Sequence, residues 1–183
     1  MDQAMDLFWR QGYEGTSIAD LTATMGISPP SLYAAFGSKR QLFGQAADRY
    51  AASHIHYLET ALTQPTARET ARSMLTGTVE AATLPGRPVG CFNIQAALAC
   101  RDTDHDVTEL LAQRRRATHT ALRTRFEQAV ADGDLTAGTD CSALARYVVS
   151  VAQGINIEAA AGAARDELLA VVELAMAALP RCQ

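Results

Sequence analysis

The sequence predicts an all-α protein, and three observations support that prediction. Alanine, the strongest helix former, accounts for 35 of the 183 residues, whereas aromatic residues make up only 6% of the chain. Apolar residues recur at spacings of three and four, and no segment alternates apolar and polar residues as a half-buried strand does. A chain of this length can bury a hydrophobic core without disulfides or metals.

The first part of the chain predicts short helices separated by glycines. Residues 1–11 form the first helix in this interpretation, and Gly12 ends it. Thr16 or Ser17 caps the second helix, because a hydroxyl at that position accepts a hydrogen bond from the first turn. Gly26 ends this helix, whose inner face is apolar at Ile18, Leu21 and Met25.

A third short helix follows Ser28, which caps it. Pro29 occupies the first helical position, where the missing N–H of proline costs nothing. Gly37 and Ser38 interrupt the chain again. Leu32 and Phe36, four residues apart, form the inner face of this helix.

Six longer helical segments make up the rest of the chain. Proline, glycine and aspartate separate them, most clearly at residues 64–66, 85–90 and 132–134. The expected helices cover residues 39–62, 67–84, 91–100, 104–131, 140–161 and 166–179.

Residues 12–43 carry the functional signal. Two short helices joined by a turn at Gly26, with a shared apolar core, are typical of a helix-turn-helix. The second helix of such a pair enters the DNA major groove with its N-terminal residues on base edges. Ser28, Ser31 and Tyr33 lie on the outer face expected for that contact.

The string GYEGTSIADLTATMGISPPSLYAAFGSKRQLF, residues 12–43, resembles the DNA-binding domain of TetR/AcrR-type bacterial transcriptional regulators. The segments GCFNIQAALA and ARYVVSVAQGINIEAAAGA also resemble a C-terminal domain of that family. The resemblance implies an all-α homodimer, with a DNA-binding head at residues 1–43 and a ligand-binding and dimerisation body at 44–183. It further implies a repressor that binds a near-palindromic double-stranded DNA operator and is released by a small-molecule effector.

The resemblance also implies DNA-contacting residues. Hydroxyl and backbone groups at the start of the second helix would contact phosphate, the first turn of the third helix would meet the bases, and a tyrosine and a lysine would contact the DNA backbone. These residues are Thr16, Ser17, Ser28, Pro29, Pro30, Ser31, Tyr33 and Lys39. For Thr16 and Ser17 a purely capping role is the alternative.

One departure from the family pattern, at Pro30, concerns the groups that read bases, and the acidic charge of the head supports a second hypothesis. Pro30 stands where many members have glycine, which removes a backbone donor. Residues 1–62 hold four basic and six acidic side chains, a net charge of −2 within a chain of −4. The alternative function is therefore a helical protein that binds a small molecule or a partner and whose head no longer binds DNA.

We expect the effector pocket in the body, because the head is too small for a cavity and the last helices are expected to pair. The candidates combine apolar walls with a few polar groups that could orient a ligand. They are Met74, Phe92, Asn93, Gln95, His119, Leu122, Phe126 and Tyr147. Each could instead be an ordinary core or surface residue.

The last two helices are expected to form the dimer interface, through one apolar stripe on each. The stripes are Leu144, Val148, Val151, Ile155 and Ala159, and Leu168, Val172, Ala175, Met176 and Leu179. The alternative is that both stripes close the monomer's own core.

Other function classes lack a motif. No phosphate-binding loop, nucleophile elbow or zinc-protease pattern is present, so we expect neither an enzyme nor a cofactor. His54 and His56 lie two apart on a helix and cannot bind one metal together. Arg114, Arg115 and Arg116 fan around a helix and are interpreted as a solvated surface.

Localisation is expected to be cytoplasmic. No secretory or membrane segment is visible, so no membrane partner is expected. The four cysteines, Cys91, Cys100, Cys141 and Cys182, form no paired motif and are interpreted as reduced thiols.

Overall fold

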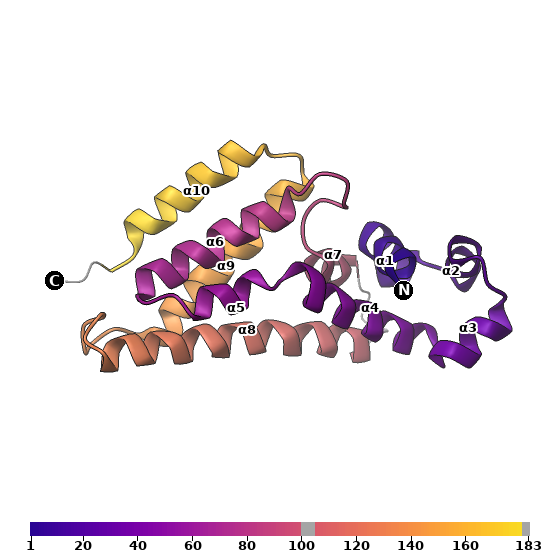
Figure 1. Ribbon diagram of the computed structural model, residues 1–183, viewed down its shortest axis with the longest axis horizontal. Coiled ribbons are helices and arrows are strands. Elements are labelled where there is room, and N and C mark those ends of the chain that lie inside the picture. The colour runs from indigo at the N-terminus through magenta and orange to yellow at the C-terminus, as the bar shows by residue number, and fades with distance from the viewer. Residues whose placement is uncertain (100–104, 181–183) are drawn as a thin grey trace.

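Ten helices and no strand occupy the part of the chain that the computed structural model describes, residues 1–99 and 105–180, which confirms the all-α fold. Helices α1 to α3 lie at one end of an elongated molecule, and α10 lies along one side of the other end (Figure 1). Helix α4 leads from the first group toward the second (Figure 1). No helix in the described residues is long and apolar enough to cross a membrane.

The first three helices begin and end where capping chemistry predicts. Helix α1 (Asp2–Gly15) is broken at Gly12, and α2 (Ile18–Met25) starts after Ser17, which exchanges hydrogen bonds with Asp20 in a capping box. Gly26 ends α2 with a φ of 66°, a left-handed conformation that glycine adopts without strain. Helix α3 (Pro29–Phe36) follows at once, so the turn between the two helices is short.

The expected long helix at 39–62 is wrong, because the structure divides it in two. Helix α4 (Lys39–His54) ends before Ile55, and α5 (Tyr57–Leu62) starts in a new direction. The break places α5 along α6 (Ala67–Ala82), where Tyr57 packs directly over Gly77. Helix propensity favours one continuous helix, but tertiary packing supplies most helical stability in proteins and prevails here.

The remaining helices agree with the expected segments to within a few residues. They are α7 (Phe92–Ala99), α8 (His105–Ala131), α9 (Cys141–Ala160) and α10 (Arg165–Ala178). Asp140 caps α9, since its carboxylate accepts a hydrogen bond of 2.9 Å from the Ala143 N–H. The expected helix limits at residues 100 and 104 lie outside the described residues, as does Cys182.

Two hydrophobic clusters hold these helices together. The body cluster joins α5, α6, the second half of α8, α9 and α10. The head cluster joins α1 to α4, but it also takes in residues from beyond the head. These are Cys91, Phe92, Ala96, Val107 and Leu111. The head is therefore packed against α7 and the start of α8, and the expected domain boundary after residue 43 falls inside α4.

An aromatic stack lies at the centre of the head cluster. The ring of Phe92, from α7, stacks on Phe43 with centroids 5.2 Å apart and on Tyr50 with centroids 5.5 Å apart. Phe8 of α1 meets the Phe43 ring edge-on at 5.2 Å. Such aromatic pairs stabilise a core by about 0.5–1.5 kcal/mol beyond the area that they bury. Phe92 thus joins a body helix to the helices of the head.

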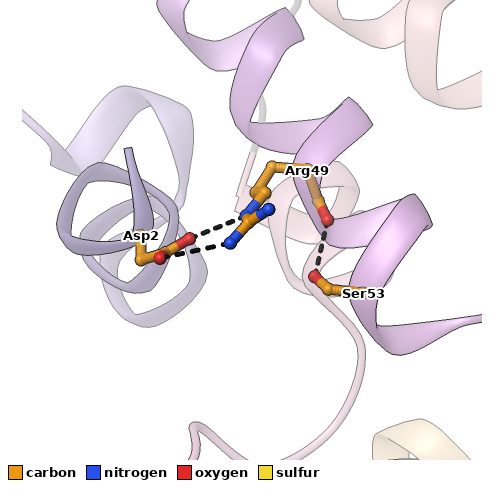
Figure 2. Close-up of polar contacts among 3 residues, drawn as sticks. All are labelled: Asp2, Arg49 and Ser53. Atoms are coloured by element: carbon orange, nitrogen blue, oxygen red, sulfur yellow. Dashed lines mark hydrogen bonds and ion pairs between the residues drawn. The ribbon is translucent and has the colours of Figure 1, made fainter.

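Ion pairs surround the same junction. Asp2, in the first turn of α1, accepts two hydrogen bonds from Arg49 of α4, at 2.8 and 3.4 Å (Figure 2). Within α4, the Ser53 hydroxyl donates to the backbone carbonyl of Arg49 at 2.6 Å (Figure 2). Two further pairs, Arg40–Asp106 and Arg114–Asp48, join α4 to α8.

The expected dimer stripes belong largely to the monomer's own core. Leu168, Val172 and Met176 of α10 are buried in the body cluster, and so are Val148 and Ile155 of α9. The alternative interpretation of these stripes is therefore the one that the structure supports. The apolar residues that α10 leaves exposed are Val171 and Leu174.

Replacing Gly77 with alanine is expected to destabilise the fold. A Cβ atom at this position would lie 2.6 Å from the Cβ of Tyr57, so α5 and α6 would have to separate. Overpacking of this kind lowers the free energy of unfolding by about 1–3 kcal/mol. Urea unfolding measures the change. Gly44→Ala is the matched control, because no atom lies within 4 Å of its new Cβ. Equal stability of the two variants would contradict this packing.

Candidate nucleic-acid interface and ligand cavity

The first turn of α3 presents side chains rather than backbone donors. Pro29 and Pro30 have no N–H, the Ser31 N–H donates to the Ser28 hydroxyl at 3.3 Å, and the Leu32 N–H donates to the Ser28 carbonyl at 3.0 Å. A helix N-terminus usually leaves backbone N–H groups available to an anion. Here they are absent or already bonded, so recognition at this edge depends on hydroxyl groups.

Those hydroxyl groups are exposed and lie on one face. The oxygens of Ser28 and Ser31 are 2.9 Å apart and share a hydrogen bond, and both side chains are exposed. Tyr33, two residues further along α3, is 47% exposed. Ser28, Pro29, Pro30, Ser31 and Tyr33 are all exposed, and the structure brings the Ser28 and Ser31 hydroxyls together.

Lys39 is positioned beside this surface by an aromatic ring. It is the first residue of α4, and its Nζ lies 4.2 Å from the centre of the Tyr13 ring. A cation over an aromatic face is attracted by the electrons of the ring, which limits the freedom of a long lysine side chain. The ammonium group is thus held near the turn between α3 and α4.

Thr16 and Ser17 are used as caps. The Thr16 side chain is fully buried and its hydroxyl donates to the Gly12 carbonyl at 2.7 Å. Ser17 is exposed, but its hydroxyl donates to the Asp20 carboxylate at 2.6 Å. The hydrogen bonds from Ser17 also lower the pKa of Asp20, which keeps a negative charge at this helix start. The capping alternative accounts for both residues, and Thr16 has no exposed group for phosphate.

A cavity of about 380 Å³ lies in the body among α5 to α9. We call it the body cavity; its lining includes Tyr57, Met74, Cys91, Asn93, Arg114 and Asn156. Two of the expected ligand residues, Met74 and Asn93, line it. The volume falls in the range of small-molecule sites, roughly 300–1,000 Å³.

The other expected ligand residues do not line the body cavity. Leu122 and Phe126 are fully buried in the body cluster, and Phe92 is in the aromatic stack. Gln95 donates to the Val89 carbonyl at 3.1 Å, and a ring nitrogen of His119 lies 3.1 Å from the Ser142 carbonyl oxygen. Tyr147 lies on the outer side of α9, where its hydroxyl is 3.5 Å from the Ala175 carbonyl oxygen. In each case another contact directs the side chain elsewhere.

Sequence reasoning missed the arginines of the body cavity. Arg114 and Arg115 line it, so their interpretation as a solvated surface is wrong. The missed signal is the helical spacing of Arg114 with Thr118 and Ala121, which places these residues on one face of α8. Because alanine and threonine are weakly apolar, that face does not stand out in the sequence.

The thiol and phenol groups near the body cavity are neutral. Burial raises the pKa of the Cys91 thiol, and burial raises the pKa of Tyr57 to about 12. Burial also raises the pKa of Tyr50, which belongs to the head cluster together with Cys91. The charge of the lining therefore comes from Arg114 and Arg115, and the described lining contains no carboxylate.

Two family descriptions match separate parts of the chain. Residues 1–46 match the family described as bacterial regulatory proteins, tetR family. Residues 67–173 match the tetracyclin repressor-like C-terminal domain. The first match covers the helix-turn-helix, and the second covers α6 to α9, which contribute most of the body cavity lining.

Individual relatives match over nearly the whole chain. The HTH-type transcriptional repressor ComR of Escherichia coli K12 is 29% identical over 173 residues, covering 93% of this chain and 82% of ComR. A cysteine variant of the TetR family transcriptional regulator CifR, solved with a 26-base-pair operator DNA, is 42% identical with a TM-score of 0.93, covering 98% and 94% of the two chains. A TetR regulator structure from Rhodococcus sp. RHA1 is 53% identical with a TM-score of 0.68, covering 98% and 97%.

Proposed function

The chain belongs to the TetR family of bacterial regulatory proteins, and we propose that it represses transcription by binding a near-palindromic operator as a homodimer. One observation carries the proposal: residues 12–43 form a helix-turn-helix in a chain that is 42% identical, over 98% of its length, to the operator-bound CifR variant. The exposed hydroxyl face of α3 supplies the surface for base contacts.

Contacts at the operator divide into two kinds. Ser28 and Ser31 carry hydroxyls that donate to or accept from base edges, and this supports a role in sequence recognition. We assign Tyr33 and Lys39 to the phosphate backbone, which fixes the position of the head on the duplex, and the exposure of Tyr33 and the location of Lys39 at the start of α4 support this. Because the α3 start offers no backbone N–H, the hydroxyl pair is the main candidate for reading bases.

The body cavity is our candidate effector site. It is largely apolar, holds a few polar groups, and is lined by Ile55, which directly follows α4, and by Asn93 and Ile94 of α7, which packs against α1 and α4. An effector that binds one arrangement of these helices more tightly shifts the population toward it. A changed separation of the two heads then no longer matches the half-sites of the operator.

The dimer is proposed to form through the exposed faces of α9 and α10. Tyr147, Ile157, Val171 and Leu174 are large apolar side chains on the outer surface of these two helices. Leu174 is 73% exposed, and a group of large exposed apolar side chains on neighbouring helices supports an interaction surface. These residues replace the buried stripes as the expected interface.

Replacing Lys39 with alanine is expected to reduce the salt dependence of DNA binding. Loss of one phosphate contact lowers the slope of log K against log salt by about one unit. Gel shifts with DNA from upstream of the chain's own gene, repeated across salt concentrations, measure the slope. Arg116→Ala is the control. It also removes one arginine, but Arg116 lies on α8, where it pairs with Glu109 of the same helix, and is not among the expected DNA contacts. An unchanged slope would remove Lys39 from the interface, and no binding by the unaltered chain would favour the alternative of a head that does not bind DNA.

Replacing Leu174 with aspartate is expected to give a soluble monomer. The new carboxylate would be buried without a partner in the α9–α10 interface, but it would be solvated in the isolated chain. Light scattering after size exclusion measures the mass. Leu84→Asp changes an equally apolar side chain that is 45% exposed at the end of α6, and should remain dimeric. A dimeric Leu174→Asp variant would contradict this interface.

A further inference from the structure

The body cavity combines an apolar lining with two arginines, and no carboxylate is among its described lining residues. Ile55, Leu58, Met74 and Val149 contribute apolar surface, whereas Arg114 and Arg115 are the charged residues of the lining. Arginine keeps its charge throughout the accessible pH range, and the phenol and thiol groups nearby are neutral. An apolar ligand that carries a negative charge would suit this lining better than a neutral or cationic ligand.

Arg114 has a buried donor, its Nε–H, that bonds to none of the described residues. One terminal nitrogen donates to the Asp48 carboxylate of α4, but the Nε–H is buried and has no hydrogen-bond partner among the described residues. A guanidinium presents its N–H groups in a planar fork that matches a carboxylate. A buried donor without a partner is unfavourable, so a ligand oxygen at this position would satisfy it.

Asn93 adds to the same cavity a second buried polar group without a hydrogen-bond partner among the described residues. Its side-chain oxygen is buried and accepts no hydrogen bond from the described residues. Asn93 belongs to α7, next to Phe92 of the aromatic stack, and it faces the cavity together with Arg114. A hydroxyl or N–H on a ligand would meet this oxygen. Two helices thus offer complementary polar groups to one bound molecule.

We propose that the body cavity binds an organic carboxylate with an apolar body, and that Arg114 holds the carboxylate. This inference rests on the proposed function, since it names the chemical class of the effector. The apolar part of the ligand packs among Met74, Ile94 and Val149. Hydrophobic contact supplies affinity, while the arginine selects the anion.

The position of Arg114 also explains how ligand binding in the body cavity changes the orientation of the head. Its pair with Asp48 is one of the two ion pairs described between α4 and α8, the other being Arg40–Asp106. A ligand carboxylate competes with Asp48 for the same guanidinium. Because α4 continues from the helix-turn-helix, a weaker α4–α8 contact lets the head change its orientation. Carboxylate binding therefore lowers operator affinity.

The test compares carboxylates with their neutral amides on the full chain. Hexanoate, octanoate and 4-phenylbutyrate serve as probes, each beside the corresponding amide, and calorimetry measures affinity. We expect at least one carboxylate to bind tenfold or more tightly than its amide, and Arg114→Gln to remove that preference. Arg116→Gln, which changes an exposed arginine outside the cavity, should retain it. Equal affinity for acid and amide, an unchanged preference in Arg114→Gln, or no carboxylate binding at millimolar concentration would overturn the proposal.

A second variant separates this mechanism from simple damage to the fold. Asp48→Asn removes the competitor for Arg114, so the preferred carboxylate should bind severalfold more tightly, which a misfolded variant cannot do. Weaker or unchanged binding would contradict competition at Arg114. Operator gel shifts on the same samples distinguish failure of the carboxylate proposal from failure of the proposed DNA-binding function. DNA binding without a carboxylate effect overturns this inference alone, whereas absence of DNA binding overturns the proposed function.

Discussion

The stack of Phe92 on Phe43 and Tyr50 is the contact on which the rest of the structure depends. It places a side chain of α7 inside the hydrophobic cluster of the head, so the head has no core that is separate from the body. A helix-turn-helix of three short helices buries little apolar surface by itself, and small cores are marginal. Packing on α7 supplies the missing surface.

The same short helix brings the stack and the body cavity together. Cys91 and Asn93, on either side of Phe92, line the cavity, while Phe92 itself points into the head cluster. A molecule in the cavity therefore contacts residues one position away from the contact that orients the head. Arg114 adds a second connection from the cavity to α4 through Asp48. Through these two connections an effector in the body cavity acts directly on residues that contact the head, without further residues in between.

Local chemistry made the helix limits of the DNA-binding head predictable from sequence. Which faces of the body helices are buried depends on long-range packing and was not predictable. Ser17, Gly26 and Ser28 define helix ends through their own side chains or backbone, and the structure confirms those limits. The faces of α10 could not be assigned in the same way, because Val172 and Leu174 have the same apolar character and the positions of α6 and α9 decide which is buried. Arg114 was misread for a related reason, since its partner Asp48 lies 66 residues away in the sequence.

A double-mutant cycle between Phe43 and Phe92 tests most directly the claim that the hydrophobic cluster of the head includes α7. Urea unfolding of Phe43→Leu, Phe92→Leu and the double variant gives the interaction free energy of the two rings. The account predicts a single transition and a coupling of about 0.5–1.5 kcal/mol. Phe43 with Phe126 of the body cluster is the control pair and should be additive. Additive effects for Phe43 and Phe92 would show that the two rings stabilise separate units, and would contradict the account.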